Sequence, residues 1–244
     1  MRGEGVIQSE AGSRSMVRAA LAWGVHAFTA LGAVVGTGAL LSLGVGNLRS
    51  AALLMLLALF IDCVDGSLAR AARVQEHAAR LDGRRLDDII DFLNYVVVAV
   101  VFLVVSGALL HPALVALPVL ASCYGFCQAD AKTDDDFFLG FPSYWNVVAL
   151  YLWLFETAPE IGSALVVALS VLVFVPLKYL YPSRMKVFYW TTNVGGALWM
   201  VALGACVAWP ERVAPFHVLL LSLFYPAYYI GGSLWFGGMA RRRA

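Results

Sequence analysis

The sequence predicts an all-α integral membrane protein with about eight transmembrane helices. Of the 244 residues, 61% are hydrophobic and only 14% are charged. The mean hydropathy is +0.78. Apolar stretches recur along the chain at close to the length of about 20 residues that a helix needs to cross a bilayer. This composition is typical of membrane proteins rather than of soluble globular domains.

The apolar stretches define the expected helices in chain order. They lie at residues 19–42, 51–70, 86–109, 112–128, 143–157, 160–179, 190–209 and 215–239. Pro118 interrupts the fourth stretch, and the fifth is short. Residues 1–16 are polar and contain glycine and serine, so we expect a flexible cytoplasmic arm there. A cleavable signal is not expected, because no short apolar core with a cleavage site follows the first charges. Residues 17–244 are expected to form one transmembrane catalytic domain.

Basic residues lie mostly on one side of the predicted membrane. Fifteen of the 17 lysines and arginines fall before the first span, around the second, fourth and sixth connections, or at the C-terminus. Only Arg49 and Arg212 fall on the opposite side. By the positive-inside rule, both termini are therefore expected in the cytoplasm. The net charge of +1 carries little information, whereas its asymmetry predicts the orientation.

Several residue types in the spans are expected to serve helix packing. Gly32 and Gly36 form a GxxxG pattern, which commonly allows close contact between membrane helices. The cysteines are expected to be small apolar residues, because they show no paired spacing in an exported loop. His26, His111 and His217 are remote in sequence from the acidic residues, so we expect packing or interfacial roles for them.

The acidic residues of the second predicted helix share one face. Residues three and four apart lie on the same side of an α-helix. This spacing aligns two aspartates with small residues and one arginine, namely Asp62, Asp65, Gly66, Ala69 and Arg70. Ionisable groups near hydrocarbon usually face a protein interior or a water-filled cavity. The stripe therefore indicates a functional site.

The third predicted helix carries a matching stripe. Gly83, Asp87 and Asp91 recur every four residues, and Asn94 and Tyr95 extend the same face. If the two stripes oppose each other, four carboxylates converge at the cytoplasmic boundary of the membrane. Four anions need neutralisation. All-oxygen ligands favour Mg²⁺ or Mn²⁺, and paired divalent ions typically bind phosphate groups. The alternative is a set of interfacial acids that pair with the nearby arginines.

The complete pattern is Asp62-x2-Asp65-Gly66-x2-Ala69-Arg70-x12-Gly83-x3-Asp87-x3-Asp91. It resembles the motif of the CDP-alcohol phosphatidyltransferases, which implies a six-helix core with two additional helices here. The gap between Arg70 and Gly83 is longer than the common family spacing by about one helical turn. In this respect, and in the stretch ADAKTDDDFFLGFPSYWN, the chain resembles the bacterial phosphatidylcholine synthases of that family.

The resemblance implies a reaction in which CDP-diacylglycerol and choline form phosphatidylcholine and CMP. It implies that Asp62, Asp65 and Asp87 bind two divalent ions, Mn²⁺ or Mg²⁺. Asp91 either completes the metal site or acts as the catalytic base that accepts the choline hydroxyl proton. The cytidine diphosphate site would be lined by Gly66, Ala69, Arg70 and Gly83. The resemblance further implies a homodimer in the bacterial inner membrane.

Two other sets of residues are candidates for substrate contacts. Ser183 and Arg184 follow Tyr181 and Pro182 on the cytoplasmic side and could bind a phosphate of the lipid substrate. The alternative is an ordinary basic loop. Choline has no N–H donor, so aromatic rings are the expected contacts, and the candidates are Tyr95, Tyr144 and Trp145. The alternative is an aromatic belt at the membrane interface.

Two other functions remain open from the sequence. Another member of the same family could use serine, inositol phosphate or glycerol phosphate in place of choline. A cation or solute transporter would also carry acidic residues within its spans. The acids lie at one end of their helices, whereas transporters tend to bind near the bilayer midplane.

Overall fold

The computed structural model describes residues 2–133, 135–182, 184–185 and 188–238, and it describes side chains from residue 15 onward. Within these residues, five helices are long and apolar enough to cross a membrane. They are Ser15–Gly44, Leu48–Ala71, Gly83–Val105, Tyr189–Ala208 and Val218–Phe236. Shorter apolar helices occupy Pro112–Cys127, Trp145–Leu154 and Pro159–Leu172. The all-α class is confirmed, and a helix lies at each of the eight predicted positions.

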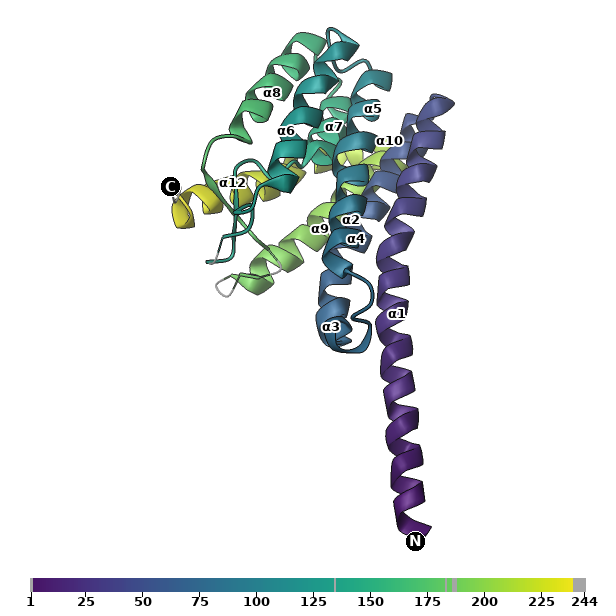
Figure 1. Cartoon of the computed structure of the whole chain (residues 1–244). Coiled ribbons are helices and arrows are strands. Elements are labelled where there is room, and N and C mark those ends of the chain that lie inside the picture. The colour runs from purple at the N-terminus through teal and green to yellow at the C-terminus, as the bar shows by residue number, and fades with distance from the viewer. Residues whose placement is uncertain (1, 134, 183, 186–187, 239–244) are drawn as a thin grey trace.

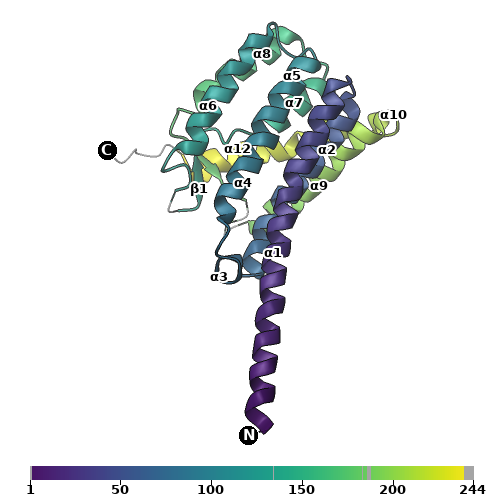
Figure 2. The same ribbon diagram turned by 45° about the vertical axis from the view of Figure 1, so that its right-hand side comes forward.

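The first half of the chain forms a helical hairpin followed by one long interrupted helix. Its elements are α1 (Arg2–Gly44), α2 (Leu48–Ala71), α3 (Val74–His77), α4 (Gly83–Asp91), the π-helical η1 (Phe92–Val97) and α5 (Val98–Val105). The N-terminal part of α1 projects beyond the other helices (Figures 1 and 2). α1 thus begins within residues 1–16, and the flexibility of that arm remains a prediction.

The second half of the chain contributes shorter helices and two strands. These are η2 (Pro112–Val115), α6 (Ala116–Cys127), β1 (Phe137–Leu139), α7 (Trp145–Leu154), α8 (Pro159–Leu172), β2 (Lys178–Leu180), α9 (Tyr189–Ala208), α10 (Pro210–Val213), η3 (Ala214–Phe216), α11 (Val218–Ser222) and α12 (Phe224–Phe236). Pro118 lies in the first turn of α6. A proline is tolerated there because the first amides of a helix have no partner within the helix.

The long gap between Arg70 and Gly83 contains a short helix of its own. α2 ends at Ala71, and α3 follows after one turn. Val74 and Ala78 are buried against Ala22 of α1. The additional residues therefore do not lengthen α2, but form a compact connection that packs on α1.

Helix α1 meets the long helix through its glycines. A Cβ at Gly32 would lie 2.8 Å from Cγ2 of Ile90, and one at Gly36 would lie 2.3 Å from Oδ1 of Asn94. Asn94 donates from Nδ2 to the carbonyl oxygens of Gly32 and Ile90, each at 3.1 Å. The predicted packing role of the GxxxG pattern is confirmed, because a side chain at either glycine would collide with the side chain of Ile90 or Asn94.

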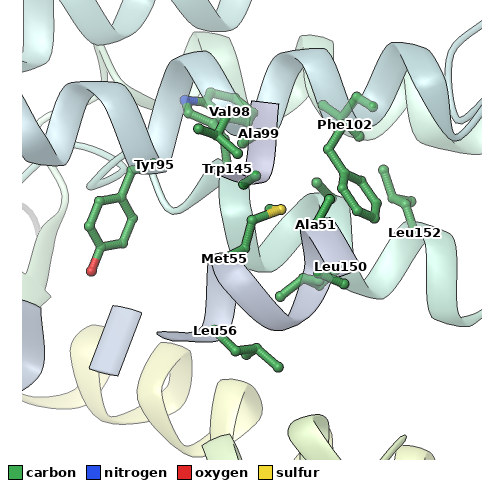
Figure 3. Packing of buried hydrophobic residues seen from close by; sticks show 14 of the residues in the cluster. Ala51, Met55, Leu56, Tyr95, Val98, Ala99, Phe102, Trp145, Leu150 and Leu152 are labelled. Carbon is green, nitrogen blue, oxygen red and sulfur yellow. The ribbon is translucent and has the colours of Figure 1, made fainter. Parts of the chain in front are cut away.

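The main hydrophobic core lies between α2, α5 and α7 (Figure 3). Met55 of α2 and Phe102 of α5 are buried beside Trp145 and Leu150 of α7. The indole N–H of Trp145 donates to Oγ of Ser122 at 2.8 Å. This core fixes α2 relative to the long helix that carries the second acidic stripe.

The sixth expected span was too long at its C-terminal end. α8 ends at Leu172, and residues predicted to be helical up to 179 include the start of strand β2. Pro176 explains part of the difference, because a proline disfavours helical geometry at the preceding residue. β1 and β2 pair in antiparallel fashion, with Phe138 opposite Tyr179. The strands hold the loop before α7 against the segment after α8.

Polar contacts join helix ends at both sides of the bundle. The guanidinium of Arg49, at the start of α2, donates to the carbonyl oxygen of Ala208, at the end of α9. Near the strands, Lys178 pairs with Asp135 at 2.5 Å. The hydrogen bond from Lys178 holds the pKa of Asp135 below its usual range. Arg49 and Arg212 were expected on the same side of the membrane. The contact between Arg49 and Ala208 agrees with this expectation, because Arg212 lies in α10, directly after α9.

Candidate active site

The four predicted aspartates come from two helices that both pack against α1. Asp62 and Asp65 lie on α2, whereas Asp87 and Asp91 lie on α4. The side chain of Asp82 caps the start of α4 by accepting hydrogen bonds from the amides of Arg84 and Arg85 at 3.1 and 3.2 Å. This cap sets where α4 begins, and helical periodicity then directs both aspartates of that helix to one face.

The carboxylates converge on one small cavity. One oxygen from each of Asp62, Asp87 and Asp91 lies within 4.8 Å of the other two. Asp65 is 6% exposed and lines the same cavity. The remaining lining residues come from the three helices that meet here, namely Thr29, Gly32, Ala58, Ile61, Ile90, Asn94 and Tyr95. The two stripes thus face each other, and the interfacial acid–arginine alternative does not describe this arrangement.

Two polar contacts position the acidic groups. The hydroxyl of Tyr95 donates to Oδ2 of Asp62 at 2.5 Å. Thr29 of α1 lines the cavity beside Asp65, and its hydroxyl acts on that carboxylate. Tyr95 lies in the π-helical segment η1, a departure from α-helical geometry that is frequent at functional sites. Within this π-helical segment, Asn94 hydrogen-bonds to Gly32 of α1 and Tyr95 hydrogen-bonds to Asp62 of α2.

The donor set fits a divalent cation. Carboxylate and hydroxyl oxygens are the ligands that Mg²⁺ and Mn²⁺ prefer, and three carboxylate oxygens lie close enough to share one ion. Without a cation, so many half-buried carboxylates would repel one another. The ammonium of Lys132, in the loop after α6, also acts electrostatically on Asp62, Asp87 and Asp91. One lysine offsets only part of their charge.

The residues expected to line the nucleotide site lie at the adjoining helix ends. Arg70 is exposed near the end of α2 and donates to Oγ of Ser67 at 3.0 Å. Gly66 lies beside the Arg70 side chain, and a Cβ there would be 3.5 Å from Nη1. Ala69 packs toward α1, and Gly83 is the first residue of α4. All four are near the aspartates along their helices, and their contacts with nucleotide remain a prediction.

The predicted phosphate-binding pair is only half described. Ser183 lies outside the described residues. Arg184 pairs with Asp136 at 3.7 Å, and its guanidinium lies 5.6 Å from the centroid of the Tyr181 ring. Arg184 does not line the acidic cavity. Its contact with a lipid phosphate therefore remains a prediction without a direct geometric link to the aspartates.

The three choline candidates have different environments. Tyr95 lines the acidic cavity, and its ring centroid lies 6.0 Å from that of Tyr144. Tyr144 in turn lies 5.8 Å from Tyr229 of α12. Trp145 is fully buried in the main core. The structure thus brings Tyr95 and Tyr144 together beside the acids, whereas Trp145 is a core residue there.

Sequence reasoning missed Thr29, which lines the cavity, and two residues in its surroundings, Lys132 and Tyr229. Thr29 and Lys132 come from segments far along the chain from the acidic motif, and Tyr229 comes from the last helix. Thr29 lies three residues before Gly32, so the close approach of the GxxxG face offered an indirect signal. No local pattern could have assigned Lys132 or Tyr229, because their positions depend on how the whole bundle packs.

The family match and the similar proteins point to the same family of enzymes. Residues 25–175 match the family described as CDP-alcohol phosphatidyltransferase. A phosphatidylcholine synthase of Pseudomonas aeruginosa is 36% identical over 229 residues, which are 91% of this chain and 94% of that protein. Phosphatidylcholine synthases of Legionella pneumophila and Legionella bozemanae are 44% and 45% identical over 169 and 136 residues. These two matches cover 67% and 54% of this chain.

The chain spans slightly less than two thirds of the two Legionella relatives, 66% and 63% of their lengths. The family match nevertheless covers more than half of this chain and contains all four aspartates. Members of this family are transferases that generally depend on divalent metal ions, which agrees with the oxygen-rich cluster. This chain is a member of the CDP-alcohol phosphatidyltransferase family.

Proposed function

We propose that this protein transfers the phosphatidyl group of CDP-diacylglycerol to choline, with phosphatidylcholine and CMP as products. The convergence of Asp62, Asp87 and Asp91 on one cavity is the observation that supports this reaction most directly. The choice of choline is supported by phosphatidylcholine synthases that are 36% to 45% identical. Because the chain belongs to a family of transferases, we favour this reaction over the transport of a cation or solute.

The reaction needs one bond to form and one to break at phosphorus. The hydroxyl oxygen of choline attacks the phosphorus that bears diacylglycerol, and the bond to the bridging oxygen breaks to release CMP. Asp62, Asp65 and Asp87 would hold two divalent ions, with Asp91 as a further ligand or as the base that accepts the hydroxyl proton. Bound Mn²⁺ or Mg²⁺ supplies the positive charge that stabilises the phosphates during transfer.

Recognition of choline would rest on aromatic rings and negative charge. A quaternary ammonium cannot donate a hydrogen bond, but it is attracted to the faces of aromatic rings. Tyr95 and Tyr144 are the two candidates nearest the acids, since Tyr95 bonds to Asp62 and lies 6.0 Å from Tyr144. We add Tyr229 as a third candidate because its ring lies 5.8 Å from that of Tyr144.

We assign the protein to the bacterial inner membrane as a multi-pass homodimer with both termini in the cytoplasm. The orientation is supported by the 15 basic residues on one side of the predicted spans. The dimer is supported by the family resemblance alone. In this orientation the acidic helix ends lie toward the cytoplasm, from which choline would enter and into which CMP would be released.

An alcohol panel tests the proposal. The purified full-length chain in detergent, with CDP-diacylglycerol and Mn²⁺ or Mg²⁺, is assayed for CMP release with choline, serine, inositol phosphate, glycerol phosphate or no alcohol. We expect release that depends on choline. Faster release with one of the other alcohols would retain the family assignment but replace choline as the substrate.

A further inference from the structure

The imidazole of His26 carries a buried nitrogen that no other protein group satisfies. His26 lies on α1 and is 5% exposed. Among the described residues, its Nε2 is the one buried side-chain nitrogen or oxygen without a hydrogen-bond partner. Buried polar groups in native proteins are nearly always paired, and an unpaired group is costly. The described part of the protein therefore leaves this nitrogen free to bond to a group from outside the chain.

The position of His26 links it to the acidic helices. Its ring lies against Gly83, where a Cβ would be 2.9 Å from Cε1 and 3.5 Å from Nδ1 of the imidazole. Gly83 is the first residue of α4, the helix that carries Asp87 and Asp91. Only a glycine leaves room for the imidazole at this position. The glycine of the acidic motif thus serves, at least in part, to admit a histidine from another helix.

Neighbouring residues hold the imidazole in place. Trp23 meets His26 edge to face, with ring centroids 5.9 Å apart. One turn further along α1, Thr29 lines the acidic cavity together with Asp65. The same face of α1 therefore presents first an unpaired imidazole nitrogen and then a residue of the acidic site. His26 itself does not line the acidic cavity, so a ligand that contacts both would have to extend from the aspartates toward the start of α4.

The start of α4 suits an anionic or nucleotide group. The amides at the N-terminus of a helix attract negative charge. Asp82 accepts from the amides of Arg84 and Arg85, so a ligand group would meet the remaining amides and the imidazole of His26. A neutral imidazole can donate one hydrogen bond from Nε2. A nucleoside diphosphate offers many acceptor oxygens along its length. Its chemistry matches both the free nitrogen and the adjacent divalent-metal ligands.

We propose that His26 is a binding residue for the cytidine diphosphate part of the lipid substrate, to which it donates a hydrogen bond from Nε2. This inference rests on the proposed function, because it concerns the same substrate at the same site. It adds a residue from α1 to a nucleotide site that the motif builds from α2 and α4 alone. His26 would orient the nucleotide while the carboxylates act at the phosphates.

Direct binding to the purified full-length protein tests this role. The dissociation constants of CDP-diacylglycerol and of CDP are measured with Mn²⁺ for the wild type, His26→Leu, His26→Met and His26→Gln. Leucine and methionine cannot donate, so we expect binding about ten- to a hundredfold weaker, as for loss of a hydrogen bond to a charged group. Glutamine keeps a donor of similar reach and should restore part of the affinity. The KM for choline should not change.

His111→Gln is the matched control. His111 lies beyond the other end of the long helix, where its Nδ1 accepts from the amide of Ala113, and this variant should bind like the wild type. The thermal midpoint without ligand gives a second readout. Leucine or methionine at position 26 should not lower it, because an unpaired buried nitrogen is replaced by an apolar group.

The outcomes separate this inference from the proposed function. Wild-type affinity for CDP-diacylglycerol in both His26→Leu and His26→Met would overturn the role of His26, whether or not choline is the substrate. Failure of the wild type to use choline, with weaker nucleotide binding in the two variants, would overturn the choice of alcohol and support the role of His26. If one apolar variant does not fold, the binding constants of the other apolar variant and of His26→Gln still test the role of His26.

Discussion

The hydroxyl of Tyr95 donates to Oδ2 of Asp62 across 2.5 Å and thereby links the two acidic helices. Tyr95 belongs to η1, directly after Asp87 and Asp91, and Asp62 belongs to α2. A hydrogen bond of this kind orients a carboxylate and leaves its second oxygen free to bind a cation. The contact also brings an aromatic ring to the site where the small alcohol is expected.

Substituting Tyr95 separates its hydroxyl from its ring. Tyr95→Phe removes the hydrogen bond to Asp62 but keeps the aromatic face. We expect activity to fall about 10–100-fold, as is typical for loss of a group that orients a metal ligand. The KM for choline should stay near the wild-type value. CMP release measured over a range of Mn²⁺ concentrations checks this, because a less well oriented ligand should raise the Mn²⁺ concentration needed for half-maximal activity. The same Mn²⁺ requirement as in the wild type would contradict the role of the hydrogen bond.

The shared metal site predicts a loss that added metal does not rescue. Asp87→Asn removes one of the three converging carboxylates, and Asp65→Asn removes the fourth acid of the cavity. We expect each variant to insert into the membrane but to lose turnover at all Mn²⁺ concentrations. Asp88→Asn is the control, since Asp88 is the next residue but does not line the cavity. Near-normal activity of Asp87→Asn at low Mn²⁺ would argue against the assignment.

The close approach of α1 to the long helix predicts different effects at two glycines. Gly36→Ala would place a methyl group 2.3 Å from Oδ1 of Asn94, whereas Gly38→Ala would place one at an ordinary 3.5 Å from Cδ1 of Leu54. Overpacking commonly costs about 1–3 kcal/mol. We therefore expect a lower thermal midpoint and lower activity for Gly36→Ala alone. Equal midpoints for the two variants would count against the packing geometry.

The aromatic contacts predict a specific effect on choline. Tyr144→Ala should raise the KM for choline about tenfold, since a cation over a ring gains roughly 0.5–2 kcal/mol. Tyr144→Phe should change it little, and the KM for CDP-diacylglycerol should be unaffected by either. Trp145→Ala should instead lower stability, by about 3–5 kcal/mol if it behaves like other buried aromatic truncations. Normal choline KM values for both Tyr144→Ala and Tyr95→Ala would exclude these two rings.

Helical periodicity explains why the sequence predicted the acidic stripes correctly. Asp62 and Asp65, like Asp87 and Asp91, lie three or four residues apart, so any helix through them directs both to one face. The cost of such groups near hydrocarbon further implies that the faces meet around a polar site. Long apolar stretches predicted a helix at each of the eight positions, and in the described part of the chain five of these helices are long and apolar enough to cross a membrane. Length and hydropathy are local properties of the chain.

The parts that the sequence did not predict depend on distant contacts. β1 and β2 have three residues each and stabilise one another across about 40 positions of chain, so neither has a pattern of its own. His26 was expected to have a packing or interfacial role, and its particular contact with Gly83 arises only when α1 lies against α4. Trp145 lies at a predicted membrane boundary, where aromatic residues are common, but its indole N–H donates to Oγ of Ser122 within the core.

The most direct test of the proposed reaction follows both products from one substrate. Purified wild-type protein is given CDP-diacylglycerol and isotopically labelled choline, and mass spectrometry quantifies labelled phosphatidylcholine together with CMP. The account predicts equal amounts of the two products with Mn²⁺ or Mg²⁺, none after chelation, and formation slower by about 10²–10⁴-fold in Asp91→Asn if that residue acts as the base. CMP release without labelled phosphatidylcholine, or product formation that persists in the chelator, would contradict it.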